Sequence, residues 1–266
     1  MKFSFKIQQY QTDAVNAVVD VFKGQVRPAH DPSYFFDPGR LVPLKTKKVK
    51  NSNAYNLFQQ ELDEQEAKQN IILGYANAPI KLDKVQLLEN ITLIQGNNNI
   101  TPSKELAEGQ GKCSLDIEME TGTGKTYVYI KTMFELNKQY AWNKFIVIVP
   151  SVAIREGVKK SFEMMEDHFM SQYGKKARCF IYDGEKRGQI ADFATSNEIN
   201  VMIINIQAFN KSLNEEKSKV GRGGDKGALR MYTECDELGS RKPVDVIAET
   251  RPILILDEPQ KLNGPA

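Results

Sequence analysis

The order of apolar and polar positions along the chain predicts an α/β protein. Short apolar runs of strand length occur at residues 145–150, 178–182, 200–206 and 252–256. Between them, apolar residues recur every three or four positions, which predicts helices over residues 127–139 and after Ser151, a residue suited to cap a helix. The uninterrupted run at residues 145–150 suits a central strand that is covered on both faces. This alternation predicts a doubly wound, mostly parallel sheet flanked by helices.

The first 112 residues follow a different pattern. Helical spacing predicts helices over residues 5–22, 53–69 and 83–95, whereas glycines and prolines break any regular element between residues 24 and 50. We therefore divide the chain into three parts. These are a first helix over residues 1–23, an insertion of partial order and without a motif over residues 24–112, and a core over residues 113–266.

Composition excludes some classes of protein and leaves nucleic-acid binding open. The 266 residues are 41% hydrophobic and 26% charged, as in ordinary globular proteins, and the net charge of +2 neither requires nor excludes a nucleic acid. No apolar run reaches transmembrane length, so we expect no membrane partner and a cytoplasmic location. The three cysteines lie far apart and suit a reducing cytoplasm. The two histidines lack ligand-spaced neighbours, which argues against a zinc site or a Ser-His-Asp triad.

Residues 113–126 have the clearest chemical pattern in the chain. Leu115, Ile117 and Met119 alternate with polar residues and predict a strand, after which come a turn and a helix. The turn holds the six residues expected to bind the phosphates of ATP: Thr121, Gly122, Thr123, Gly124, Lys125 and Thr126. Glycines allow a tight turn, and successive backbone N–H groups and the helix N-terminus attract an oligophosphate. Lys125 can reach the β/γ-phosphates, and the Thr126 hydroxyl is placed to bind Mg²⁺.

Position 119 departs from the strict phosphate-loop pattern G-x-x-x-x-G-K-[ST], which asks for glycine where this chain has Met119. The phosphate-binding cup is made by residues 121–126, so the departure weakens the pattern match and leaves the chemistry intact. The alternative is a turn between a strand and a helix that holds a lysine by chance.

Two carboxylates, Asp257 and Glu258, follow the last apolar run. The carboxyl ends of parallel strands share one edge of a sheet, so we expect the pair to lie near the phosphate loop. There Thr126 and Asp257 would hold Mg²⁺, Lys125 would neutralise phosphate charge, and Glu258 would orient or deprotonate the attacking water. Without such a loop, the pair would simply face solvent. No arginine is evident as an arginine finger.

Three features stay open between a structural and a functional interpretation. The glutamines near residue 10 either begin a polar helix or bind adenine, because an amide offers both donors and an acceptor. The basic run at residues 45–50 is either solvated surface or a phosphate contact. The Gly-rich stretch at residues 211–243 is expected to be a mobile loop, and its Arg222, Lys226 and Arg230 are either solvated or in contact with a DNA backbone.

The loop and the acidic pair together resemble motifs I and II of superfamily 2 helicases and translocases, which have a RecA-like P-loop NTPase fold. Residues 8–15 resemble the Tyr-Gln-x-x-Ala signature that precedes motif I, which implies that Gln11 binds adenine. Residues 149–158 and 203–209 resemble motifs Ia and Ib. They imply DNA-backbone contacts, unless these are ordinary loop residues, at Pro150, Ser151, Arg155 and Gln207. Gln260, at the end of motif II, would couple hydrolysis to movement.

Three of these motifs are similar to one family in particular. Residues 118–127, the Pro-Ser-Val-Ala-Ile-Arg-Glu-Gly form of motif Ia and the Leu-Asp-Glu-Pro-Gln form of motif II resemble the Res subunit of type III restriction–modification enzymes, where Met119 is usual. The resemblance implies that residues 1–266 form the first RecA-like motor domain. Such a domain would use ATP and Mg²⁺ to move on double-stranded DNA, in complex with a Mod (methyltransferase) subunit. In that family a nuclease domain near the far C-terminus cleaves the DNA.

The resemblance also implies that the RecA-like fold is incomplete at its C-terminus, because the sequence stops just after motif II. The motif III strand, which usually lies between the strands of motifs I and II, would be missing, and its absence would leave strand edges unpaired. We therefore expect a truncated chain with weak or no ATPase activity of its own. Two other functions stay open: another superfamily 2 motor, from type I restriction or repair, and a non-catalytic module that binds a nucleotide or DNA.

Overall fold

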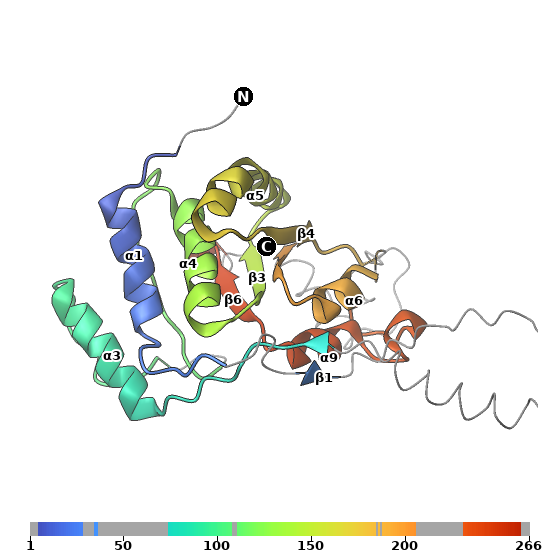
Figure 1. Cartoon of the computed structure of the whole chain (residues 1–266), viewed down its shortest axis with the longest axis horizontal. Coiled ribbons are helices and arrows are strands. Elements are labelled where there is room, and N and C mark those ends of the chain that lie inside the picture. Colours follow the sequence, from blue (N-terminus) through green and yellow to red (C-terminus); the bar gives the residue numbers. More distant parts are fainter. Residues whose placement is uncertain are drawn as a thin grey trace, which may run out of the picture.

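The computed structural model describes residues 5–28, 35–36, 74–107, 111–184, 186, 188–205 and 231–261. Its helices lie on both sides of a central sheet (Figure 1). One side holds α4 (Lys125–Tyr140) and α5 (Val152–Tyr173), with α1 (Gln9–Asp20) against α4 and α3 (Lys84–Asn97) outermost. The other side holds the short helices α6 (Gly188–Thr195) and α9 (Pro243–Glu249).

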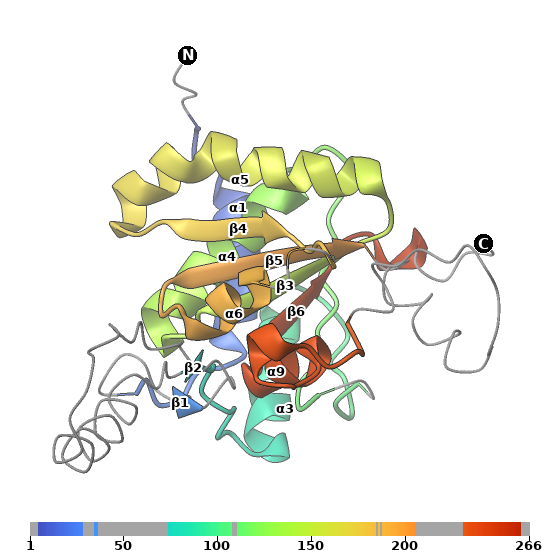
Figure 2. The ribbon, with the colours of Figure 1, turned by 90° about the vertical axis from the view of Figure 1, so that its right-hand side faces the viewer.

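The central sheet consists of four parallel strands in the order β4–β5–β3–β6 (Figure 2). Their bounds are β3 (Lys144–Val149), β4 (Ala177–Ile181), β5 (Ile199–Asn205) and β6 (Ile253–Leu256). Every residue of β3 and β5 is buried, which explains their uninterrupted apolar sequences. The predicted parallel sheet flanked by helices is therefore confirmed. A separate antiparallel pair joins β1 (Phe35–Phe36) to β2 (Gly74–Tyr75).

The two faces of the sheet belong to two hydrophobic cores. Phe145, Val147 and Val149 of β3 point into a large core with α1, α4 and α5, whereas Ile146 and Ile148 point into a smaller core with α6 and α9. Burial of one such side chain contributes about 1.5–3 kcal/mol relative to exposure. Both faces of β3 therefore stabilise the sheet on which the functional edge is built.

The strand predicted from Leu115, Ile117 and Met119 is wrong, because residues 113–120 have no regular secondary structure. A strand needs a neighbour for its backbone N–H and C=O groups, and in the described part of the chain β6 pairs with β3 alone. Leu254 and Leu256 on β6 are 47% and 48% exposed, and Ile117 is 53% exposed. Leu254, Leu256 and Ile117 thus display apolar surface, whereas Leu115 and Met119 pack against the large core.

The predicted helices that fall on described residues are confirmed, although the first begins at Gln9 and not at residue 5. The Ser151 side chain caps α5 by accepting a hydrogen bond from the Ile154 N–H at 3.3 Å. The short helices α6 and α9 were not predicted. Residues 231–243, expected to lie in a mobile loop, instead contain the 3₁₀ turn η1 (Asp236–Leu238) and the buried Met231 and Cys235.

The described part of the interval 24–112 packs directly onto the core. Asn77 accepts hydrogen bonds from the N–H groups of Asn143 and Lys144 with its side-chain oxygen, and its side-chain nitrogen donates to the Lys144 and Arg251 carbonyls. This single amide ties the amino-terminal ends of β3 and β6 together.

Several predictions fall outside the described residues. They concern the helix over residues 53–69, the basic run at residues 45–50, Gln207, Arg222, Lys226 and Arg230. No helix in the described ranges is both long enough and apolar enough to cross a membrane.

Candidate nucleotide and metal site

The phosphate loop turns at two glycines in the left-handed region. Gly122 and Gly124 have φ angles of +83° and +86°, which L side chains rarely adopt. Gly124 precedes α4, and its carbonyl accepts a 3.0 Å hydrogen bond from the Val128 N–H. Because α4 begins at Lys125, the positive end of its dipole and its first N–H groups lie at the loop. This backbone geometry is what an anion-binding turn requires.

Helix α1 holds two side chains against this loop. The Gln11 side-chain nitrogen and the Tyr10 hydroxyl both donate to the Thr123 carbonyl, at 2.9 Å and 3.1 Å. A pocket of about 370 Å³ lies at this contact, lined by Phe5, Lys6, Gln8, Tyr10, Gln11, Gly122, Thr123, Gly124 and Tyr127. Aromatic rings next to an anion-binding loop suit a flat base attached to phosphates. The structure therefore brings Gln11 to the loop, and its contact with adenine stays a prediction.

Strand β6 carries the acidic pair to the carboxyl edge of the sheet. The Asp257 N–H donates to the Ile148 carbonyl at 2.9 Å, so the ladder between β3 and β6 continues into Asp257. Glu258 is half-buried and has a φ of +53°, an uncommon conformation for a residue with a side chain. Such strain often marks a functional position. Gln260 follows in the 3₁₀ turn η2 (Pro259–Lys261) and is exposed.

Tyr129 links the phosphate loop to the acidic pair, and no sequence pattern singled it out. It lies three residues after Thr126 on α4, so the two side chains share one helix face. Burial, followed by the charge of Asp257, raises the pKa of the Tyr129 phenol, while the neighbouring Thr126 hydroxyl acts in the opposite direction. Thr126, Tyr129 and Asp257 therefore share one environment.

The residues at this edge fit a magnesium ion. Mg²⁺ takes oxygen ligands and keeps several waters, and Thr126 and Asp257 offer a hydroxyl and a carboxylate. Among the described residues, no group of three or more His, Cys, Asp or Glu could hold a metal by itself. A metal ion bound here would therefore depend on nucleotide phosphates and water for most of its ligands, as Mg²⁺ commonly does in phosphate sites.

Helix α5 also reaches the pocket beside the loop. The Tyr127 hydroxyl and His168 Nε2 form a 3.0 Å hydrogen bond, and the Phe5 ring lies 5.1 Å from the His168 ring. Burial, and then the charge of Lys131, lower the pKa of His168. One wall of the pocket is thus connected to α5.

The predicted DNA contacts are described only in part. Pro150 and Ser151 are half-buried and follow β3 at the edge where Asp257 lies. The Arg155 side chain pairs with Glu156 at 3.0 Å. Gln207 lies outside the described residues. The structure therefore gathers Pro150, Ser151 and Arg155 at the start of α5, and their contact with DNA stays a prediction.

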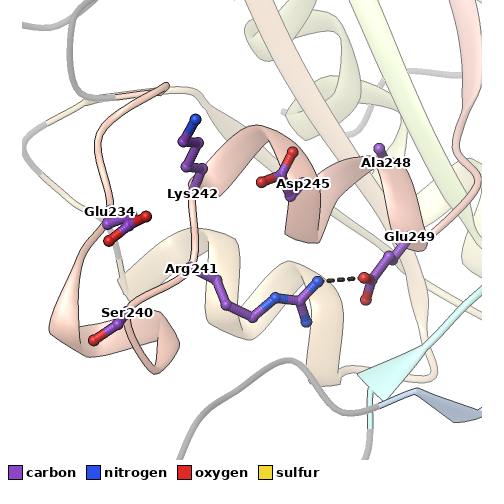
Figure 3. A pocket seen from close by; sticks show the side chains of 7 residues that line it. All are labelled: Glu234, Ser240, Arg241, Lys242, Asp245, Ala248 and Glu249. Carbon is purple, nitrogen blue, oxygen red and sulfur yellow. Dashed lines mark hydrogen bonds and ion pairs between the residues drawn. The ribbon is translucent and has the colours of Figure 1, made fainter.

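A second pocket, of about 520 Å³, lies beside η1 and α9 (Figure 3). Its lining consists of Glu234, Ser240, Arg241, Lys242, Asp245, Ala248 and Glu249. The Arg241 and Glu249 side chains form an ion pair across it. It shares no residue with the phosphate loop or the acidic pair, and its lining mixes three carboxylates with two basic side chains.

Comparison with known proteins gives relatives of one kind. A family model described as type III restriction enzyme, res subunit, matches residues 4–259. The EcoP15I Res subunit of a type III restriction-modification enzyme of Escherichia coli is 32% identical over 198 residues, which cover 70% of this chain and 20% of that protein. The EcoPI Res subunit of Escherichia phage P1 is 28% identical over 218 residues, which cover 77% of this chain and 21% of that protein.

A third relative is the StyLTI Res subunit of Salmonella typhimurium. It is 34% identical over 169 residues, which cover 56% of this chain and 16% of that protein. The chain thus spans about a fifth of the length of the first two relatives.

Proposed function

The chain belongs to the family of type III restriction enzyme Res subunits, and on this premise we propose that it is the ATP-binding first motor domain of a DNA translocase. The family has a RecA-like helicase fold, which agrees with the parallel sheet flanked by helices. The main support is one arrangement: a phosphate loop turned by Gly122 and Gly124, next to a helix whose Thr126 and Tyr129 share an environment with Asp257.

Each residue of the loop and the acidic pair has a role in this proposal. Residues 121–126 hold the triphosphate, and the Lys125 ammonium, which has no ion-pair partner among the described residues, neutralises charge at the β/γ-phosphates. Thr126 and Asp257 hold Mg²⁺, which when bound stabilises the negative charge of the phosphates. The Glu258 carboxylate orients the attacking water or accepts its proton.

Two glutamines extend the site. Gln11 already donates to the Thr123 carbonyl with its nitrogen, and its side-chain oxygen is then left to accept a hydrogen bond from the adenine amino group. The exposed Gln260 couples the site to the rest of the motor.

The proposal also includes contacts with DNA and with a partner subunit. We expect double-stranded DNA to run along Pro150, Ser151 and Arg155, with Gln207, and a Mod (methyltransferase) subunit to select the DNA site in the cytoplasm. Contacts with a phosphate backbone release counterions, so affinity for DNA should fall steeply with salt. A flat dependence on salt would contradict these contacts.

Hydrolysis by the 266-residue chain alone should be slow. Among the residues that line the pocket at the phosphate loop there is no arginine, and an arginine finger is typically worth about 10³–10⁵ in rate. This shortfall in charge stabilisation affects the transition state, so it lowers the rate without preventing ATP from binding.

Titration calorimetry and phosphate release with two variants test the proposal. Lys125→Ala should lose ATP·Mg²⁺ binding, because it removes the positive charge at the phosphates. Glu258→Gln should keep binding and lose the residual hydrolysis. Hydrolysis that survives Glu258→Gln would show the role of Glu258 to be wrong. An unmodified chain that binds no nucleotide contradicts the proposed function itself.

A further inference from the structure

The phenol of Tyr129 is a buried polar group with unsatisfied hydrogen-bonding capacity. Its oxygen is shielded from solvent and makes no hydrogen bond of good geometry to any described residue, although the Thr126 hydroxyl is close enough to act on it. A hydroxyl buried in this way costs about 1–3 kcal/mol compared with one that is satisfied. Most buried polar groups in native proteins are paired, so an orphaned hydroxyl calls for an explanation.

Packing holds this hydroxyl in place. The Tyr129 ring packs against the large hydrophobic core, which restricts its rotation. The phenol lies beside the Thr126 hydroxyl and close enough to Asp257 for the carboxylate charge to act on it. The phenol therefore lies near both residues that would hold the metal ion.

We propose that Tyr129 is a positioning residue of the metal site, with its phenol donating a hydrogen bond to the Asp257 carboxylate when nucleotide and Mg²⁺ are bound. This inference rests on the proposed function. A carboxylate has two oxygens with about four acceptor sites, so one oxygen can face the metal or its waters while the other accepts from Tyr129. Hydrogen bonds to a ligating group fix its orientation, and their loss typically weakens metal binding about 10–100-fold.

The proposed contact requires a donor, and the phenol proton of Tyr129 supplies one. A phenol is protonated at neutral pH and can donate. Phenylalanine keeps the ring and its packing and lacks the donor. Tyr129→Phe is therefore a test of the hydrogen bond with little change of shape.

The experiment compares ATP affinity with Mg²⁺ and with a chelator in the 266-residue chain, by titration calorimetry. The ratio of the two affinities measures the contribution of the metal ion. We expect Tyr129→Phe to reduce this ratio about tenfold. We also expect its melting temperature without ligand to equal or exceed that of the unmodified chain, because the change removes an unsatisfied buried group.

Tyr140→Phe is the matched control. Tyr140 lies on the same helix, and its phenol donates to the Val19 carbonyl at 3.1 Å, remote from the loop. This variant should melt at a lower temperature and keep the unmodified affinity ratio. Tyr129→Phe should thus change the affinity ratio and Tyr140→Phe the melting temperature, and this difference separates a role at the metal site from a role in packing.

Three results would overturn the inference. An unchanged affinity ratio in Tyr129→Phe would show that the phenol makes no such hydrogen bond at the metal site, and it would not contradict the proposed function. A lower melting temperature with an unchanged ratio shows that the phenol serves packing alone. If the unmodified chain binds ATP no better with Mg²⁺ than with chelator, the inference and the metal part of the proposed function fail together.

Discussion

The Gln11 side-chain nitrogen donates a 2.9 Å hydrogen bond to the Thr123 carbonyl and fills the space beside Gly124. A Cβ atom at position 124 would lie 2.6 Å from that nitrogen. The first helix and the phosphate loop are therefore fitted to each other through one amide. The contact connects a residue expected to bind adenine with the turn expected to bind phosphate.

Gly124→Ala should weaken both the fold of the loop and nucleotide binding. The Gln11 amide can move aside, but it then loses its bond to Thr123, and alanine at a φ of +86° adds about 1–2 kcal/mol of backbone strain. We expect a lower free energy of unfolding and at least a tenfold loss of ATP affinity. Chemical denaturation and titration calorimetry measure the two effects.

A double variant serves as the control for Gly124→Ala. Adding Gln11→Ala removes the steric conflict and leaves the backbone strain, so stability should recover only in part. Full recovery would show that the contact with Gln11, and not the left-handed conformation, is the reason for glycine.

Gln11→Glu tests the amide in another way. The substitution keeps the shape of the side chain and replaces the donor to the Thr123 carbonyl with an acceptor, so the two oxygens repel each other. We expect weaker ATP binding and a reduced preference for ATP over GTP, measured by competition with a fluorescent nucleotide. Gln9→Glu, a neighbouring glutamine whose nitrogen bonds only to Asp13 at 2.8 Å, is the matched control and should leave the preference unchanged.

Local chemistry made these loop positions predictable from the sequence. Left-handed φ angles favour glycine, and a lysine and a threonine follow directly, so the loop can be recognised from residues 121–126 alone. The strand predicted just before it fails for a non-local reason. Apolar alternation at Leu115, Ile117 and Met119 is necessary for a strand, but a ladder also needs a partner, which the pattern of one segment does not reveal.

His168 should make the stability of the chain depend on mildly acidic pH. Burial and Lys131 hold its pKa below the ordinary value of 6.5, so the unfolded chain binds the proton more readily than the folded chain. The contribution of the neutral His168 to the free energy of unfolding is fully present above pH 6.5 and is lost as the pH falls through the lowered pKa. We expect melting temperatures measured from pH 7.5 down to about pH 5 to decline less steeply in His168→Gln. A decline in His168→Gln as steep as that of the unmodified chain would mean that the pH dependence does not belong to His168.

Lys144 should make the stability of the chain depend on pH in the alkaline range. Its side chain is fully buried, donates to the Phe193 and Ser196 carbonyls, and burial lowers the pKa of Lys144 to about 7. Between that value and its ordinary 10.5 the unfolded chain binds the extra proton, so stability rises with pH across this window and is lost again as the pH falls toward 7.

Lys144→Met removes this titration. The variant keeps most of the buried stem and leaves two carbonyls without the amine donor, at a cost of about 1–3 kcal/mol per carbonyl. Its free energy of unfolding should nevertheless change little between pH 7.5 and about pH 9.5, whereas that of the unmodified chain should rise. Parallel profiles for the two proteins would show that the amine is charged in the folded state.

The proposed role of Tyr129 could not be predicted from the sequence. A tyrosine three residues after the loop is an ordinary helix residue by pattern. Its interest lies in a buried hydroxyl near Asp257, and the two residues are 128 positions apart in the sequence. By contrast, Asp257 could be predicted, because the rule that parallel strands end at one edge places it without knowledge of any side-chain contact.

The exposed leucines of β6, the strand at the end of the sheet, should promote self-association. Leu254 and Leu256 are about half exposed, and in the described part of the chain no strand pairs with this edge. Replacing both leucines with threonine keeps the β-propensity of the strand and removes the apolar surface. We expect the double variant to stay monomeric at concentrations where the unmodified chain associates, as measured by sedimentation velocity, with little change in melting temperature.

The neighbouring residues of the same strand give an internal control. Ile253 and Ile255 alternate with the leucines, point to the opposite face and pack against the large core. Replacing these two with threonine should lower the free energy of unfolding by about 1 kcal/mol or more for each, because apolar surface leaves the core, and should not reduce association. If the leucine and isoleucine double variants associate to the same extent, the exposed leucines are not the cause of association. Equal association by the leucine variant and the unmodified chain would place the adhesive surface elsewhere.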